Sequence, residues 1–393
     1  MKDGKKVLYD NLLDLKDYSD KTSTYSNKNS RFKNEKEVID YYQKNSKNIE
    51  KFNELKKNKD LYNNFIDYIT GRKSLPLMYD EVFKKIFDFN LHPERLTSLL
   101  TSILRFDVEI KCIENCKVVT SLQGASIIFD ILVRLTDNRL VNLEVQKKPH
   151  YFSGPRMSVY TATLVMRQFN SLKGTNDYND LKKVYTIIIF EKTPKEFKGN
   201  NPEHKFLIHG NMKFDVDIEL GMLEEIYIIA LDIFAEHEYS INIDDIKGKN
   251  PEEITDEEFI RCCDYELSIW LKLLTSRSDE EVTMLAEKYE WIEEIYLELM
   301  KFMEDPDDFM NMVYNVMAEA DRVSLESEND MLRKQIEEEK LVFADAIAEK
   351  DSAIAEKDNV INVQDETIRK LLEYLENANL PIPEGIADMK HGR

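Results

Sequence analysis

Residues 127–148 restrict the fold more than any other stretch of this chain, because two β-rich runs there alternate apolar and polar side chains across a short polar link. The apolar residues of both runs fall at odd positions: Ile131, Val133, Leu135, Val141, Leu143 and Val145. Side chains of a strand alternate between two faces, so both sets bury against one layer only if odd positions pair with odd positions. That pairing requires a loop with an odd number of residues, such as three. The stretch therefore predicts a β-hairpin whose register is fixed.

The other face of this predicted hairpin is polar and carries Asp130, Asn142, Glu144 and Gln146. Asp is disfavoured inside strands, and a lone buried carboxylate is costly. Two carboxylates placed close together repel each other, and a divalent cation is their usual partner. The alternative is an amphipathic hairpin whose polar face is solvated. The residues alone do not decide between a metal site and a solvated face.

Periodicity predicts the elements around the hairpin. Helical spacing predicts helices over residues 79–89, over residues 93–105, and from the Ser153-Gly154-Pro155 start signal to about residue 169. Apolar β-rich runs predict strands over residues 108–113, 117–122, 184–190 and 226–234, with an edge strand over residues 205–209.

Three motifs in this part of the chain resemble those of one family. Asp130, a hairpin turn and Glu144-x-Gln146 resemble the D…(E/D)xK signature of the PD-(D/E)XK nucleases. The resemblance is closest to the variant with Gln in the Lys position, found in bacterial recombination-promoting nucleases known as family transposases. Residues 79–87 are similar to the opening D-x-x-F-K-x-[IL]-F helix of this family, and Arg156-x-x-x-Tyr160 is similar to its R-x-x-x-Y helix. The resemblance covers roughly residues 76–235.

The resemblance implies a restriction-endonuclease-like α/β domain over residues 74–235, with a mixed sheet flanked by helices. It also implies an Mg²⁺-dependent DNA endonuclease, for which Mn²⁺ is an alternative ion, with a role in recombination or transposition. Asp130 and Glu144 would bind the metal, the Val145 carbonyl would be a further ligand, and Asp80 would be a third acid nearby. Gln146 can orient a water molecule, but unlike Lys it supplies no positive charge and no base.

Basic residues near the hairpin are candidates for DNA binding. Arg156, Tyr160, Thr163 and Arg167 recur at spacings of four, three and four, so they share one helix face. Two arginines on such a face suit phosphate oxygens. Lys84 lies one turn after Asp80 on a polar helix face and is a further candidate. A solvated face with tyrosine packing at its margin is the alternative.

Charge and cysteine content limit the class of protein. The net charge is −21, but residues 1–200 carry 35 Lys and Arg against 26 Asp and Glu, whereas residues 201–393 carry 19 against 49. The half with the hairpin is therefore basic and compatible with attraction to phosphate, although its net charge of +9 does not by itself suggest DNA. The cysteines, Cys112, Cys116, Cys262 and Cys263, lack zinc-site spacing and predict reduced thiols in the cytoplasm. The sequence predicts neither a membrane span nor a signal peptide.

The chain outside residues 74–235 divides by pattern into four regions. Residues 1–73 predict an extension that is flexible at first and helical later, with packing on the next domain favoured over nucleic-acid binding. Residues 251–305 predict an acidic helical region. Residues 306–378 predict a long helix, and residues 379–393 form a tail after it.

The long helix carries a heptad pattern. Strict seven-residue spacing relates Ile347, Ile354, Ile361, Ile368 and Leu375. The partner seam positions hold Lys350, Lys357 and Gln364, which weaken the seam. The stripe needs a partner, which is either a second copy of the chain or the helical region near residues 251–302. Strict seven-residue spacing favours another long helix, so the pattern predicts a coiled coil and hence a homo-oligomer, most simply a dimer. A solvated acidic helix with one apolar stripe is the alternative.

A second function from another class also fits the motifs. An inactive nuclease-like domain would serve as a DNA-binding or assembly scaffold, with the predicted coiled coil as its partner surface. Binding of divalent metal separates the two hypotheses, because a scaffold has no need of a functional carboxylate pair.

Overall fold

The computed structural model describes residues 4–13, 31–45, 47–119, 126–147, 154–172, 177–216, 218 and 220–382. The chain divides into two compact units, residues 1–320 and residues 321–393. Within the described ranges, no helix combines the length and apolarity that a membrane span needs. The predicted hairpin and all the predicted site residues lie in the first unit.

The predicted hairpin forms, with the predicted register. Strand β4 (Ile131–Leu135) pairs with β5 (Leu140–Gln146), and Ile131 lies opposite Leu143. The loop has three residues, since the Leu135 N–H donates to the Arg139 carbonyl at 2.9 Å. Asn138 in the loop has φ +70°, a left-handed conformation that Asn tolerates better than most residues. The odd positions of the apolar residues in both strands were therefore sufficient to predict that odd positions pair with odd positions.

The hairpin is part of a mixed sheet of six strands in the order β1-β4-β5-β6-β8-β7. The other members are β1 (Ile110–Ile113), β6 (Val184–Phe190), β7 (Leu207–Asn211) and β8 (Glu224–Ala230). Strands β5, β6 and β8 run parallel to one another, while β1 and β7 pair antiparallel with their neighbours. β7 is an edge strand, as predicted. The strand predicted over residues 226–234 ends at Ala230, and helix α9 (Leu231–Glu236) follows it.

The run predicted as one strand from residue 127 to residue 135 is broken. Its first part, β3 (Ser126–Ile128), pairs with β2 (Lys117–Val119) in a separate two-stranded sheet. Phe129 and Asp130 lie between β3 and β4, outside both strands. The prediction of Asp130 inside a strand was therefore wrong: pairing with β2 turns the chain away just before β4.

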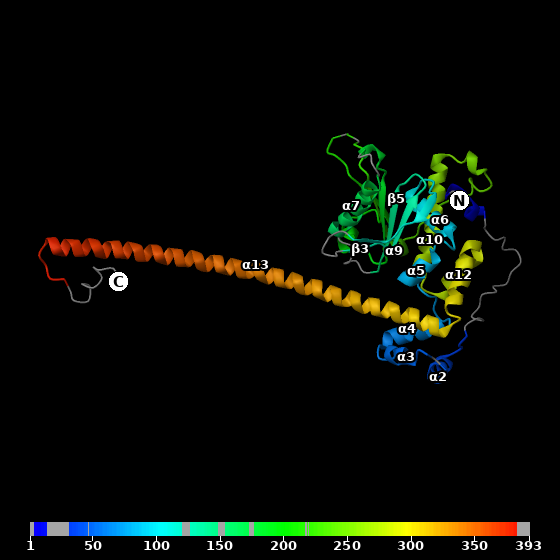
Figure 1. Ribbon diagram of the computed structural model, residues 1–393, viewed down its shortest axis with the longest axis horizontal. Helices are drawn as coiled ribbons and strands as arrows, with labels where there is room; N and C mark the ends of the chain where they lie inside the picture. Colours follow the sequence, from blue (N-terminus) through cyan, green and yellow to red (C-terminus); the bar gives the residue numbers. More distant parts are fainter. Residues whose placement is uncertain are drawn as a thin grey trace. The chain divides into compact units, whose positions relative to one another are not determined.

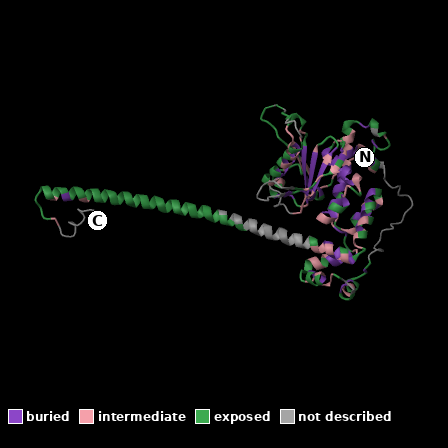
Figure 2. Cartoon of the chain, in the orientation of Figure 1, coloured by how far each residue is buried: buried purple, intermediate pink, exposed green. Residues whose placement is uncertain are grey.

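Both faces of the sheet are covered (Figure 1), by α7 (Gly154–Ser171) on one side and by α6 (Pro93–Leu104) with α10 (Asp256–Thr275) on the other. On the second side Val133, Leu143 and Ile187 join the main core. On the α7 side Leu132 and Leu164 join a second cluster. Figure 2 shows the central strands coloured as buried. The alternative of a hairpin whose polar face is solvated is therefore wrong, since Asn142 and Glu144 are buried.

The first unit contains further helices, most of which pack on the main core. They are α1 (Gly4–Leu13), α2 (Glu35–Asn45), α3 (Ile49–Leu55), α4 (Lys59–Ile69), α5 (Asp80–Ile86), α8 (Lys195–Gly199), α11 (Asp279–Lys288) and α12 (Glu290–Phe302), with short 3₁₀ turns at Tyr178–Asp180 and Pro251–Glu253. One cluster of buried apolar residues runs from Phe32 to Met312. Residues expected as an N-terminal extension, a nuclease-like domain and an acidic helical region thus share one core.

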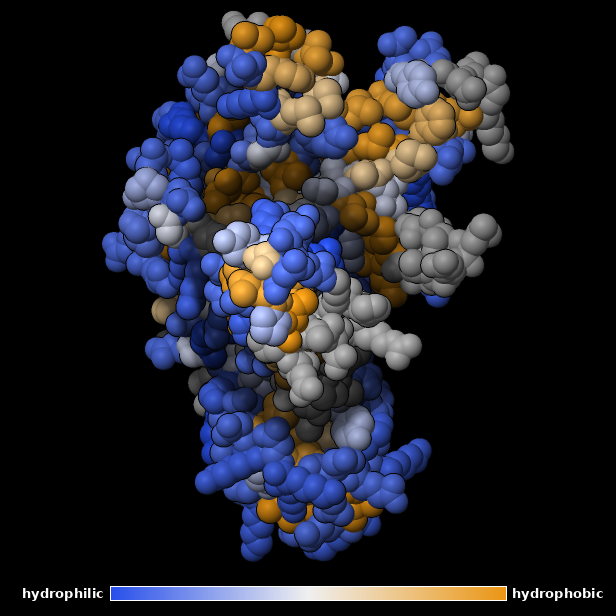
Figure 3. Space-filling view, turned by 90° about the vertical axis from the view of Figure 1, so that its left-hand side faces the viewer, coloured by the Kyte–Doolittle hydropathy of each residue, from blue (hydrophilic) through white to orange (hydrophobic). Residues whose placement is uncertain are grey.

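Large apolar side chains stay exposed at alternate positions after β7: Met212, Phe214, Val216, Ile218 and Leu220. Figure 3 shows hydrophobic patches between hydrophilic regions on one face of the protein. Alternation is typical of a strand, yet the described residues of this segment pair with no neighbour in the sheet.

The long helix predicted over residues 306–378 is α13 (Pro306–Asn377). Pro306 occupies its first position, where the missing N–H has no cost, and Pro381 lies shortly after its end. Ile347, Ile354 and Ile361 are 59%, 56% and 53% exposed. The helix is confirmed, and the coiled coil stays a prediction.

Candidate active site

Asp130 and Glu144 are tied to each other through the backbone. The Asp130 N–H donates to Glu144 Oε1 at 3.2 Å, and the Val145 N–H donates to Asp130 Oδ2 at 2.9 Å. Each carboxylate is thus oriented by a peptide group next to the other carboxylate. The bend before β4 makes this possible, because it frees the Asp130 N–H from the strand ladder.

Burial shifts the pKa values of both carboxyls in this pair. Glu144 is only 1% exposed and Asp130 is half-buried. Burial raises the pKa of Asp130 to about 6, and the charge of Asp80 adds to the rise, while the Val145 N–H acts in the opposite direction. Burial, followed by the charge of Asp130, raises the pKa of Glu144 well above its ordinary value. Two carboxylates in such a place are stable in their ionised forms only with compensating positive charge.

Helix α5 brings Asp80 and Lys84 to the same place. Lys84 Nζ donates to Asp80 Oδ2 at 2.8 Å, an i,i+4 pair on the helix surface. The charges of Asp80 and Asp130 both favour the protonated amine, and the pKa of Lys84 is raised although burial alone would lower it. Asp80 and Lys84 therefore lie within electrostatic reach of the carboxylate pair.

Helix α7 contributes Arg156 and Tyr160. The Arg156 Nη2 group donates to the Tyr160 hydroxyl at 2.9 Å, and that hydroxyl donates to the Ile128 carbonyl at 3.1 Å. Tyr160 also packs edge-on against Phe129, with ring centroids 5.2 Å apart. The positive charge of Arg156 lowers the pKa values of both carboxyls. The predicted R-x-x-x-Y pair thus holds the chain that leads into Asp130 and places a guanidinium beside the site.

Arg167, from the same predicted helix face, has a different environment. Its Nη2 forms an ion pair with Glu114 at 2.7 Å, and its Nη1 donates to the Asn115 carbonyl at 2.8 Å. Glu114 also binds Arg134. The structure therefore brings Arg156 and Tyr160 to the carboxylate pair and holds Arg167 on Glu114.

Gln146 is the last residue of β5. Its side chain leaves the strand on the same side as that of Glu144 and is half-buried. Its carbonyl accepts from the Glu191 N–H at 2.8 Å. The next residue is a lysine, but Lys147 Nζ lies over the Tyr79 ring, 4.1 Å from the centroid, at the residue that caps α5. Lys147 thus contacts the residue that precedes α5.

Two residues near the site were not among the predicted site residues. Cys116 Sγ lies 3.7 Å from the Asp130 carbonyl, a contact that the pairing of β2 with β3 brings about. All four cysteines are free thiols. Asn142 was placed on the polar face but given no role, and it is completely buried beside Glu144. Its position two residues before Glu144 was the available signal.

The carboxylate pair fits a divalent cation. Its side chains offer oxygen donors with like charge, the set that hard cations such as Mg²⁺ prefer. The Val145 backbone also faces this place, since its N–H binds Asp130. Among the described residues, no three His, Cys, Asp or Glu side chains converge as a complete metal-binding group. A cation here would thus depend on two carboxylates supplemented by backbone, water or substrate oxygens.

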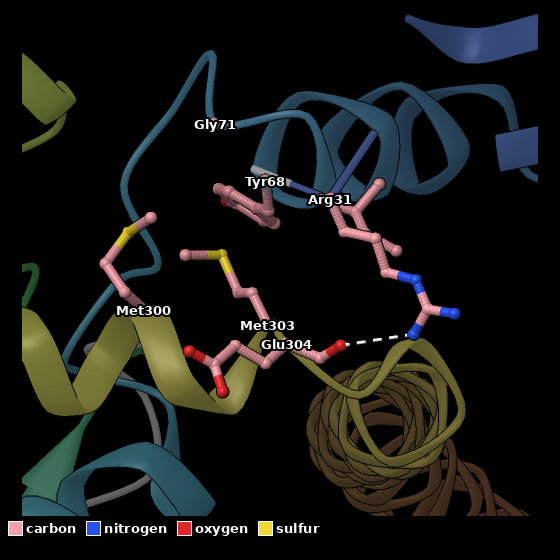
Figure 4. Close-up of a pocket in the computed structure, with 7 residues that line it drawn as sticks. Arg31, Tyr68, Gly71, Met300, Met303 and Glu304 are labelled. Carbon is pink, nitrogen blue, oxygen red and sulfur yellow. Dashed lines mark hydrogen bonds between the residues drawn. The ribbon is translucent and has the colours of Figure 1, made fainter. Parts of the chain in front are cut away.

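A separate hollow of about 250 Å³ lies between α4, α12 and the chain before α2. Figure 4 shows the side chains of Tyr68, Met300 and Met303 around it, and Arg31 Nη1 donating to the Glu304 carbonyl at 3.4 Å. Its lining contains none of the predicted site residues.

Comparison with known proteins identifies the family. The chain matches the model of the PD-(D/E)XK nuclease family transposase over residues 77–325, more than half of its length. The match extends past the predicted domain end at residue 235, through α10–α12 to the first part of α13. No curated protein and no solved structure shows significant similarity to the chain. The match agrees with a restriction-endonuclease-like α/β fold and indicates a nuclease or transposase-like function. The chain belongs to the PD-(D/E)XK nuclease family transposases.

Proposed function

We propose that this protein is a divalent-metal-dependent DNA endonuclease that hydrolyses phosphodiester bonds, with a role in recombination or transposition. The observation that supports it most is the Asp130–Glu144 pair, in which Glu144 is buried, Asp130 is half-buried, and two backbone hydrogen bonds join the two residues. A purely structural pair of this kind would place two desolvated like charges together without benefit. The free thiols and a DNA substrate fit a cytoplasmic setting.

Asp130 and Glu144 would hold Mg²⁺, or Mn²⁺ in its place, with the Val145 carbonyl as a further ligand. A divalent cation held there supplies positive charge for the phosphate oxygens and acidifies a water molecule. Asp80 raises the negative potential that attracts the cation and positions Lys84 through their ion pair. Gln146 lies on the Glu144 side of β5, where its amide would orient the attacking water.

Lys84, Arg156 and Tyr160 would contact the DNA backbone. Arg156 and Lys84 are positive groups within electrostatic reach of Asp130, as a phosphate next to the cation requires. Tyr160 orients Arg156 through their hydrogen bond. Arg167 is a weaker candidate for DNA contact. It would have to break its ion pair with Glu114 before it could bind a phosphate.

Arg156→Ala and Lys84→Ala are each expected to slow DNA cleavage by roughly tenfold, because each removes one phosphate contact. Loss of one contact should also reduce the slope of log K against log salt by about one unit. Binding to a labelled duplex across a salt series measures this slope. Lys44→Ala is the control, since Lys44 is exposed and pairs with the exposed Asp40 one turn earlier in α2. If both variants keep the wild-type salt dependence of DNA binding and the wild-type cleavage rate, Arg156 and Lys84 have a structural role and do not contact DNA.

We also propose that the protein is a homo-oligomer, most simply a dimer, through a coiled coil of α13. The apolar ladder of Ile347, Ile354 and Ile361 is exposed in the single chain, and an isolated helix gains little stability from propensity alone. Seven-residue spacing favours a second long helix as the partner. Two nuclease domains would then act on one duplex.

Ile354→Asp is expected to dissociate this dimer, because it places an unpaired carboxylate in the seam. Sedimentation equilibrium at micromolar concentration should show a dimer for wild type and a monomer for the variant. Ser352→Asp, which adds the same charge two residues earlier, is the control and should remain dimeric. A monomeric wild-type protein contradicts the proposal.

A further inference from the structure

Asn142 is a buried polar residue without satisfied hydrogen bonds. It is 0% exposed, and neither its Nδ2 nor its Oδ1 has a hydrogen-bond partner among the described residues. An unsatisfied buried polar group is costly, and buried side-chain polar atoms usually have partners. Asn142 therefore needs a reason other than the stability of the fold.

The surroundings of Asn142 are otherwise well satisfied. In β5 it lies between Leu132 of β4 and Thr186 of β6. The Thr186 and Thr161 hydroxyls bond to each other at 2.9 Å, linking β6 to α7. Leu132 and Leu140 on this side of the sheet belong to the apolar cluster under α7. An apolar side chain at position 142 would fit this layer better than an amide does.

Glu144 is a neighbouring charged group that an amide suits. The two residues are two positions apart on β5, so their side chains leave the strand on the same side. Both are completely or almost completely buried. The Asn142 amide favours the ionised form of Glu144, although no hydrogen bond of normal geometry joins them. The Asn142 amide thus lies near the Glu144 carboxylate, two residues earlier in β5.

We propose that Asn142 is a positioning residue for Glu144: its amide donates to the carboxylate oxygen that the Asp130 N–H does not bind, once a divalent cation occupies the site. This inference rests on the proposed function. The Asp130 N–H fixes one oxygen of Glu144, and the amide would fix the rotation of the other. Groups that orient metal ligands in this way typically change metal affinity or activity by about 10–100-fold when they are removed.

Asn142→Leu is the decisive variant, and Thr186→Val is its matched control in the same buried layer. Without metal, Asn142→Leu should unfold at the wild-type temperature or a few degrees higher, because it removes two unsatisfied polar atoms. Titration calorimetry with Mn²⁺ should show roughly tenfold weaker binding. Thr186→Val should lose thermal stability, since it breaks the bond to Thr161, and should bind Mn²⁺ as wild type does.

Three results would overturn the proposal. Unchanged Mn²⁺ affinity in Asn142→Leu would show that Asn142 does not position Glu144, while the proposed function would stand. A wild-type protein that binds no Mn²⁺ would overturn both. If Asn142→Leu does not fold, Asn142→Ala provides the same affinity comparison, and a large loss of thermal stability in both variants would make Asn142 structural.

Discussion

Glu144→Gln is expected to reduce DNA cleavage by roughly 10³-fold or more, because it removes one of the two charges that would bind the cation. The change preserves the shape of the side chain and an oxygen for the Asp130 N–H. It also removes the repulsion between Glu144 and Asp130, so the free energy of unfolding without metal should rise by roughly 1 kcal/mol. Loss of activity with a gain of stability is the signature of a functional site.

The measurement is plasmid cleavage over time, together with thermal unfolding in chelator. Glu203→Gln is the control, because Glu203 is an exposed acid paired with Lys205 and should have wild-type activity and stability. Cleavage by Glu144→Gln at the wild-type rate would remove Glu144 from the catalytic assignment.

Glu266→Gln is expected to change how the stability of the protein depends on pH. Glu266 of α10 is completely buried, and its Oε1 accepts from Ser98 Oγ at 2.6 Å and from Asn11 Nδ2 at 2.5 Å. Its Oε2 has no partner among the described residues, and Trp270 Nε1 donates to Ser98 at 2.9 Å. This cluster joins α1, α6 and α10. Burial raises the pKa of Glu266 from 4.5 to about 7.

The sign of the effect follows from this shift. The folded state holds the proton more tightly than the unfolded state, so the contribution to stability is fully present below pH 4.5 and is lost as pH rises to about 7. At pH 8 the wild-type protein must bury an ionised Glu266. Glu266→Gln should then be more stable than wild type by about 3 kcal/mol, and should lose this advantage near pH 5.

Guanidinium unfolding at pH 5 and at pH 8 measures this difference. Glu203→Gln again serves as the control, since the exposed Glu203 should give the wild-type dependence at both values. Equal differences between wild type and Glu266→Gln at the two pH values would contradict the assignment of the titration to Glu266.

The sequence predicted those elements whose rules are local. Odd positions in both runs of the hairpin allowed only one parity of pairing, and Ile131 accordingly lies opposite Leu143. The run over residues 184–190 is buried throughout and apolar except for Thr186, because β6 is covered on both faces. Pro306 and Pro381 bracket the long helix, so its ends were predicted within one residue or two.

Features that depend on distant partners could not be predicted. The break before Asp130 requires β3 to pair with β2, whose position the sequence does not give. Arg167 has the spacing of a site residue, but Glu114, 53 residues earlier, binds it. Asn142 was on the polar face of the predicted hairpin, and only the packing of α7 shows that this face is buried. In each case the missing information is a contact between residues far apart in the chain.

The central claim is that this chain cleaves DNA with a divalent cation held by Asp130 and Glu144. Incubation of the purified wild-type protein with supercoiled plasmid, with Mg²⁺ or with excess chelator, tests it most directly. Nicked or linear DNA is expected with Mg²⁺, and intact supercoiled DNA is expected with chelator. Intact plasmid under both conditions, or equal cleavage under both, would contradict it. Intact plasmid together with tight DNA binding would instead favour the nuclease-like scaffold.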